Sequence, residues 1–281
     1  MRGYFTTFYV TEIDPGSAGT LCDSLHPEWA GMRFFSPQGP RAWNDLGQVL
    51  DGTRFQATGP TSQPIHFEMP KSRMWGVGFL PLGWARYVKL PAAEFANRMW
   101  DGFQHPGYAP FIPLARMLLD SKDTEANELG LIVDFFRRFD TANLPDERQI
   151  VAIHSALVDP EVVTVSQLCE RVAASQRTIE RTSQRNFGFS PKLLLRRQRF
   201  MRSLVQFMLD PTLNWIGAMD SNYHDQAQFV RDFHEFMGMT PRDYASQPHP
   251  VLERFLHERM KAHGAAVQTL DRPDGTPSRA A

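Results

Sequence analysis

The sequence lacks the features that mark several classes of protein. Two cysteines in 281 residues are too few for a disulfide scaffold or a structural zinc site. No apolar run reaches the about 18 residues that a membrane span needs, and no apolar segment follows the first residues as in a secretory signal. The formal net charge of −1 excludes a uniformly basic surface but leaves room for a local basic face. We therefore expect a cytoplasmic, two-domain protein without metal or cofactor.

The two halves of the chain differ in pattern. Residues 1–143 hold most of the aromatic residues and much of the glycine and proline, whereas residues 144–250 have apolar residues at helical spacing. From about His263 onward there is no periodicity. We predict an α+β protein: a mixed β-rich and helical front domain over 1–143, an all-α domain over 144–250, and an extension over 251–281 that ends in a disordered tail.

Local signals place the elements within these halves. Short β-type segments begin at Tyr4, Met32 and Met74. Helices are expected over Pro91–Trp100, where proline suits the first turn, and over Thr124–Phe139. In the second half, residues that cap helix N-termini stand before apolar-periodic stretches at Thr164, Ser175, Ser190 and Asp225.

The second half contains an internal repeat at an offset of 50 residues. The matched pairs are Ile179 and Phe229, Arg181 and Arg231, Gly188 and Gly238, Ser190 and Thr240, and Pro191 and Pro241. Each unit predicts a short helix, a tight turn, a second helix and a glycine stop, which is the helix-turn-helix arrangement. Asn222 suits the second turn, because asparagine tolerates the left-handed conformation. A long helix from Pro191 to about Leu209 would join the units.

Helix geometry predicts which side chains face outward. With Phe229, Phe233 and Phe236 buried on one stripe, Ala227, Gln228 and Arg231 point away. By the same argument Ile179 is buried, and the outward set of the first unit is Arg177, Arg181, Gln184 and Arg185. Arginine and glutamine are common readers of base edges in the major groove. The stretch from Ser175 to Arg202 contains eight basic residues and only one acidic residue. Its candidates for phosphate contacts are Lys192, Arg196, Arg197 and Arg199.

At these residues, roughly from Gln149 to Tyr244, the sequence resembles the AraC/XylS family of bacterial transcription regulators. The most specific stretch runs from Asn222 to Tyr244, and a second runs from Ser175 to Arg181. The resemblance implies a sequence-specific DNA-binding regulator and not an enzyme. It implies base contacts by Arg177, Glu180 and Arg181 from the first unit, and by Gln226, Ala227, Gln228 and Arg231 from the second. Partners would be double-stranded DNA, RNA polymerase for an activator, an effector and a second copy.

Ser183 departs from the family, which usually has a core aromatic residue there, and where the second repeat has Phe233. Either Phe187 and Phe189 fill the space, or the first unit is looser than the second. Asn222 stands where the family has glycine. Cys169 replaces a small alanine, and we expect it to pack beneath the recognition helix.

The front half also resembles the N-terminal domains of some AraC-type regulators, in the stretch from Trp75 to Arg86. That resemblance implies a β-rich domain for effector sensing or dimerisation. Candidates for an effector pocket are aromatic and include Phe34, Trp43, Trp75, Phe79 and Trp84, with Phe35 beside them; the competing interpretation makes them core.

Two further hypotheses concern reactive side chains. The alternative to a regulator is a DNA-associated alkyl-transfer enzyme that uses Cys22, the only cysteine of the front half. We expect that thiol to be half-buried and unreactive. His26 and Glu28 are expected on the surface without a catalytic role, and no metal spacing links His66, His105 and His154.

Overall fold

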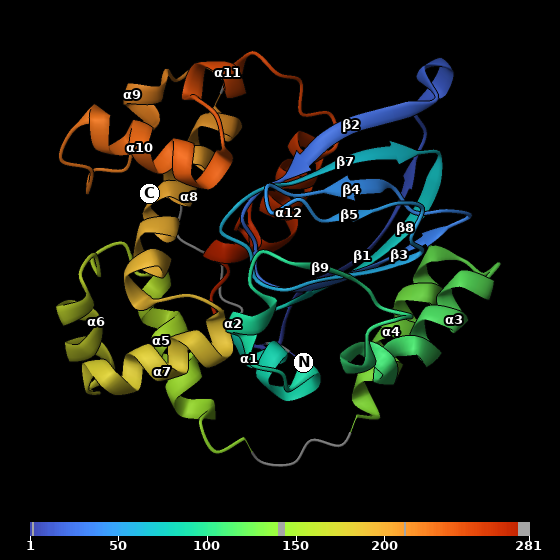
Figure 1. The fold of residues 1–281 in the computed structure, drawn as a ribbon, viewed down its shortest axis with the longest axis horizontal. Coiled ribbons are helices and arrows are strands. Elements are labelled where there is room, and N and C mark those ends of the chain that lie inside the picture. Colours follow the sequence, from blue (N-terminus) through green and yellow to red (C-terminus); the bar gives the residue numbers. More distant parts are fainter. Residues whose placement is uncertain (2, 140–143, 211, 275–281) are drawn as a thin grey trace.

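The computed structural model describes residues 1, 3–139, 144–210 and 212–274. Two antiparallel sheets with a few helices make up the front domain, and a cluster of helices from α5 to α11 makes up the second domain (Figure 1). The predicted α+β class, with the β-rich part first, is confirmed. The expected boundary near residue 143 falls beside residues 140–143, which lie outside the described residues.

The front domain is built from a five-stranded and a four-stranded sheet. The larger has the order β1 (Phe5–Ile13), β8 (Ser72–Phe79), β3 (Gly31–Ser36), β6 (Phe55–Thr58) and β9 (Met99–Asp101). The smaller has the order β2 (Thr20–Leu25), β7 (Ile65–Pro70), β4 (Arg41–Trp43) and β5 (Val49–Leu50). The segments expected at Tyr4, Met32 and Met74 correspond to β1, β3 and β8.

Alternation along the strands gives the larger sheet two different apolar faces. Phe34 and Trp75 face one way and join a core that includes Phe136 of α4. Phe35 and Met74, their neighbours in the chain, join a second core with residues of the smaller sheet. The space between the sheets is therefore separate from the main aromatic core, and this separation positions the cavity described below.

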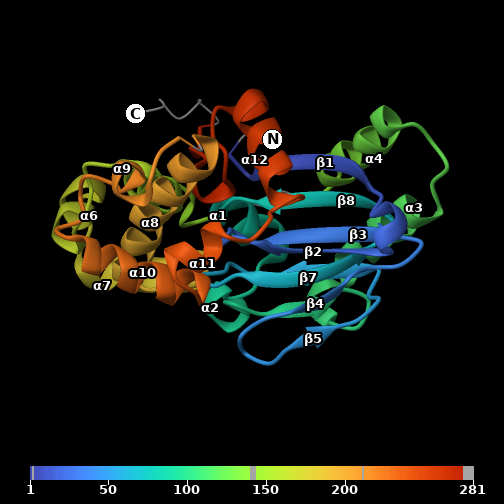
Figure 2. The same cartoon turned by 90° about the horizontal axis from the view of Figure 1, so that it is seen from above.

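Helices cover the outer face of the larger sheet and close its ends (Figures 1 and 2). They are α1 (Pro81–Gly83), η2 (Trp84–Val88), α2 (Ala92–Phe95), η3 (Pro106–Phe111), α3 (Ile112–Asp120) and α4 (Glu125–Arg137). A further short helix, η1 (Gly16–Ala18), lies in the turn between β1 and β2. The helix expected over Thr124–Phe139 is confirmed as α4, with the Thr124 side chain as its cap.

The helix expected over Pro91–Trp100 is wrong beyond its first turn. It ends at Phe95, because Ala96 is extended and Asn97 has a positive φ of 56°. The Asn97 side chain accepts a 2.7 Å hydrogen bond from the backbone of Ser62, and the chain then pairs with β6 as β9. Strand pairing with a distant segment has overridden the local helical pattern.

The second domain contains two similar helix pairs joined by one long helix. Its helices are α5 (Glu147–Val158), α6 (Val165–Val172), α7 (Gln176–Phe187), α8 (Pro191–Leu209), α9 (Trp215–Ala218), α10 (Gln226–Met237) and α11 (Pro241–Ala245). The predicted caps are confirmed: Thr164, Ser175, Ser190 and Asp225 each accept a hydrogen bond from the first turn of the helix that follows.

Part of the C-terminal tail, which was expected to be disordered from about His263 onward, is folded as far as residue 274. After α11 the chain returns to the front domain as α12 (Leu252–His263), followed by η4 (Gln268–Leu270) (Figure 2). Ala266, Thr269 and Asp271 are buried, and Gln198 of α8 donates a hydrogen bond to the carbonyl of Thr269. The segment was misjudged because its order comes from packing against two distant surfaces, which periodicity does not reveal. Residues 275–281 lie outside the described residues.

Candidate DNA-binding surface and front-domain cavity

The first helix pair, α6 and α7, has well-formed ends. Thr164 and Gln167 form a reciprocal capping box at the start of α6, and Ala173 turns the chain with a φ of 54°. On α7 the side chains of Arg177, Arg181 and Arg185 are exposed. Glu180 and Gln184 are half-buried and hydrogen-bonded to each other. The outward orientation expected for the three arginines is therefore observed, and their contacts with DNA remain predictions.

The second helix pair, α9 and α10, repeats this plan around an aromatic stripe. Phe229, Phe233 and Phe236 are fully buried as expected. Opposite them lie the exposed side chains of Gln226, Ala227 and Arg231, and half-buried Gln228, whose side chain accepts a hydrogen bond from the His224 backbone. Asn222 does not have the left-handed conformation that was expected. Its side chain donates to the carbonyl of Pro160, before α6, and so ties the second pair to the first.

The basic face is smaller than the sequence predicted, because acidic residues of the second pair neutralise part of α8. Arg196 bonds to Asp232 at 2.6 Å and also to Glu235. Arg199 reaches the other oxygen of Asp232 at 3.0 Å, and Arg202 pairs with Asp220. These pairs attach α10 and the turn before it to α8. On α7 and α8, the exposed cations that have no ion pair among the described residues are Arg177, Arg181, Arg185 and Lys192.

Arg197 is not available for DNA, which corrects its assignment as a phosphate contact. Its side chain has an exposed fraction of 0%, since it points from α8 into the front domain. It donates a 2.8 Å hydrogen bond to the carbonyl of Thr61 and lies 4.0 Å from the ring centroid of Trp29. Burial lowers the pKa of Arg197 to about 9, which leaves the guanidinium charged at neutral pH.

Trp29 of the front domain also helps to fill the space that a core aromatic residue would occupy at Ser183. The Ser183 side chain is fully buried, and its hydroxyl has no hydrogen-bond partner within the described part of the chain. Phe187 and Phe189 both join the core of the first pair, as one alternative proposed. The front domain adds Trp29, whose ring lies 5.7 Å from that of Phe187. Cys169 packs at the edge of this core, as expected. The first unit is therefore completed by a residue of the other domain.

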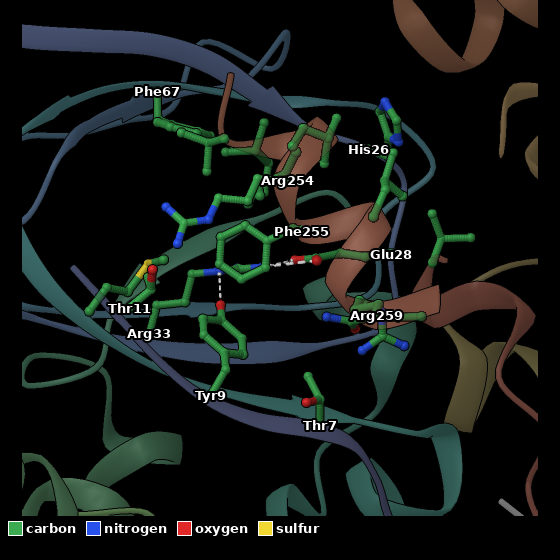
Figure 3. Close-up of a pocket in the computed structure, with 18 of the residues that line it drawn as sticks. Thr7, Tyr9, Thr11, His26, Glu28, Arg33, Phe67, Arg254, Phe255 and Arg259 are labelled. Atoms are coloured by element: carbon green, nitrogen blue, oxygen red, sulfur yellow. Dashed lines mark hydrogen bonds and ion pairs between the residues drawn. The ribbon is translucent and has the colours of Figure 1, made fainter. Parts of the chain in front are cut away.

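A cavity of about 440 Å³ lies between the two sheets and beneath α12 (Figure 3). Phe35, Phe67, Met69 and Met74 supply apolar walls. The aromatic set proposed for an effector pocket is wrong. Phe34, Trp75, Phe79 and Trp84 belong to the core on the opposite face of the larger sheet, and Trp43 stacks on His66. Only Phe35, at the next position of β3, lines the cavity, because neighbouring strand residues face opposite sides.

The cavity has a polar centre built by Glu28, Arg33 and Tyr9. Nη2 of Arg33 donates to both carboxylate oxygens of Glu28, at 2.7 and 2.9 Å, and Nε donates to the Tyr9 hydroxyl at 3.2 Å. Gly76 is required here, since a Cβ at that position would lie 1.9 Å from the Tyr9 ring. The pair raises the pKa of Arg33 despite its burial, so the polar centre is a neutralised ion pair.

His26 and Glu28 are buried, with exposed fractions of 5% and 8%, and not on the surface as expected. Nε2 of His26 forms a 2.7 Å hydrogen bond with the hydroxyl of Tyr244, from α11. Burial lowers the pKa of His26 to about 3, which keeps the ring neutral. The histidine thus joins the cavity region to the second domain. Sequence reasoning missed this role because the partner is more than two hundred residues away.

The surroundings of Cys22 do not favour a reactive thiol. Cys22 is exposed on β2 and not half-buried as expected, and its cross-strand partner is acidic Glu68, whereas reactive thiols favour electropositive surroundings. Within the described ranges, no three His, Cys, Asp or Glu side chains are arranged to hold a metal ion. None of the described helices is both long and apolar enough to cross a membrane.

Among the comparisons with known proteins, the match to a family model falls in the second domain. Residues 168–247 match the model of a helix-turn-helix domain family. No match is found among curated protein sequences.

Among solved structures, ToxT from Vibrio cholerae is similar at 10% identity, over 86% of this chain and 98% of that one, with a TM-score of 0.47. ToxT from Vibrio cholerae with a bound unsaturated fatty acid is similar at 9% identity, over 86% and 95% of the two chains, with a TM-score of 0.43. Likeness at this level does not extend to ligands or targets. Residues 168–247, from within α6 to just beyond α11, are an AraC-type helix-turn-helix DNA-binding domain.

Proposed function

We propose that this protein is a sequence-specific transcription regulator that inserts α7 and α10 into two adjacent major grooves of one DNA duplex. One observation carries the proposal: both helices present, at matching positions of the repeat, an exposed arginine that has no ion pair with any described residue, Arg181 and Arg231. The joining helix α8 has 19 residues and is therefore about 28 Å long. Successive major-groove faces are about 34 Å apart, so one chain spans two grooves.

The proposed base contacts are exposed residues of the two recognition helices together with half-buried Glu180, Gln184 and Gln228. Base edges would be contacted from α7 by Arg177, Glu180, Arg181, Gln184 and Arg185, and from α10 by Gln226, Ala227, Gln228 and Arg231. Lys192, in the first turn of α8, is the proposed phosphate contact, and the paired Arg196 contributes less because Asp232 and Glu235 already neutralise it.

The front domain would supply control. A cavity of about 440 Å³ falls within the usual range of small-molecule sites, and its walls connect to the DNA-binding domain through Tyr244 and α12. We propose an effector in this cavity, a second copy of the chain or RNA polymerase as protein partners, and action in the cytoplasm, where a bacterial regulator meets its DNA.

Binding to DNA from upstream of its own gene tests the proposal. The full chain is titrated with this DNA and with an unrelated fragment across a range of salt. We expect a specific complex that survives about 0.15 M salt, that Arg231→Ala weakens, and that Arg116→Ala, an exposed position on α3, leaves unchanged. Equal, salt-sensitive binding to both fragments, or no binding at low salt, would contradict the proposal.

A further inference from the structure

The helix that follows the DNA-binding domain forms one wall of the front-domain cavity. Asp23 of β2 accepts hydrogen bonds of 2.9 Å from the backbone N–H groups of Val251 and Leu252, which fixes the start of α12. Phe255, one turn later, places its ring 5.1 Å from that of Tyr9 in an edge-to-face contact. The cavity is therefore composite, with strands of the front domain on one side and α12 on the other (Figure 3).

The charges around this cavity do not balance. Arg33 is neutralised by Glu28, Arg259 is paired with Asp271 at 2.7 Å, and Glu258 at the rim is paired with Lys261 at 3.0 Å. The buried ring of His26 stays neutral, because burial lowers its pKa to about 3. The cation that remains among the described lining residues is Arg254, which is exposed and has no ion pair.

The position of Arg254 suits an anion at the edge of an apolar space. Its guanidinium extends from α12 over the cavity, on the same side as Phe67 and Thr11 (Figure 3). Apolar side chains, including Phe35, Phe67 and Met69, line much of the cavity. A ligand that fills the cavity would thus bury a hydrophobic body and leave one end within reach of the Arg254 guanidinium, which binds oxyanions through parallel N–H groups.

We propose that this cavity binds a small molecule with an apolar, ring-sized body and one anionic group, and that Arg254 of α12 binds the anion. The inference gives a chemical class to the effector of the proposed regulator and in that respect rests on that function. Because α12 follows α11 and the helix-turn-helix units in the chain, such a ligand contacts both the front domain and the extension of the DNA-binding domain. Its binding would hold α12 against the two sheets of the front domain.

Two fluorescent probes of matched shape test the site on the full chain without DNA. 8-Anilinonaphthalene-1-sulfonate has the required aromatic body and one anion, and N-phenyl-1-naphthylamine has the same rings without the sulfonate. We expect one competitive site per chain for the two probes. Arg254→Gln should weaken the sulfonate probe about three- to tenfold and leave the neutral probe within about twofold.

The matched control is Arg98→Gln, which removes an exposed arginine that does not line the cavity; it should change neither affinity. Probes that bind without competing, or an Arg254→Gln variant that binds the sulfonate probe as the native chain does, would overturn the inference. The two proposals fail separately. Loss of specific DNA binding with intact Arg254-dependent probe binding would reject the regulator and keep the site, and the opposite result would reject the site alone.

Discussion

Arg197 lies in a basic stretch of sequence that suggests a contact with DNA, but the structure places it elsewhere. Its guanidinium is buried between the domains, where Nη1 donates to the carbonyl of Thr61 at 2.8 Å and to that of Glu28 at 3.5 Å, and the Trp29 ring lies 4.0 Å away. Nε and Nη2 have no partner among the described residues. The informative change is Arg197→Met, which keeps a flexible, apolar side chain against Trp29 and removes the charge. Lys192→Met, in the first turn of the same helix, is the matched comparison because Lys192 is exposed.

The expected effect on stability is small because opposing contributions are of similar size. The lost hydrogen bond from a charged donor is worth about 1.5–3 kcal/mol and the desolvated cation–π contact about 2 kcal/mol. Against these stand the cost of burying an uncompensated ion, several kcal/mol, and two unsatisfied donors. We expect the free energy of unfolding to change by less than about 1.5 kcal/mol.

The assay is DNA affinity as a function of salt, together with denaturant unfolding. Arg197→Met should leave both the affinity and the salt slope as in the native chain. Lys192→Met should make the slope shallower by about 0.9 for one phosphate contact. A slope reduced equally by Arg197→Met would refute the reasoning, because Arg197 would then reach DNA and α8 would have to leave the front domain on binding.

Three other changes have defined outcomes. Arg231→Ala should cost about 1–3 kcal/mol of specific binding, confined to one base position, in affinities for single-base variants of the site; an equal loss on every sequence would make Arg231 a phosphate contact. His154 is buried and its pKa is lowered to about 3, so the native chain should lose stability as the pH falls below about 6.5, and His154→Leu should remove about 2 kcal/mol of the loss between pH 7.5 and 5 in chemical unfolding. An unchanged pH dependence would mean that the ring is not buried neutral. Ser183→Ala should raise the free energy of unfolding by about 1 kcal/mol, since the buried hydroxyl has no partner; a lower thermal midpoint would show that the hydroxyl is bonded.

The parts of the fold that depend on local chemistry were predictable from the sequence. Ser175, Ser190 and Asp225 cap their helices because a side-chain oxygen three residues before a free N–H acts without help from distant residues. The stripe of Phe229, Phe233 and Phe236 follows from helical periodicity alone. The α+β class and the two helix-turn-helix units follow from these signals and from the repeat.

The parts that depend on distant contacts were not predictable. Asn97 and β9 interrupt an apparent helix because β6 offers a partner strand. Arg197 looks like any other cation of a basic run until Trp29 is placed beside it. The cavity was missed because two sheet faces carry similar residues: Phe34 and Phe35 are neighbours in the chain, and only the pairing of the sheets shows which one faces the space between them.

The most direct test of the central claim is a guanine-N7 methylation-protection experiment on DNA selected by the full chain from a random pool, with the number of chains per DNA measured alongside. Two units joined by one rigid helix should protect two clusters of major-groove guanines about one helical turn apart, with one chain bound. Arg231→Ala should remove protection in only one of the clusters. A single protected cluster per chain, or two clusters that appear only when two chains bind, would contradict the claim that one chain reads two adjacent grooves.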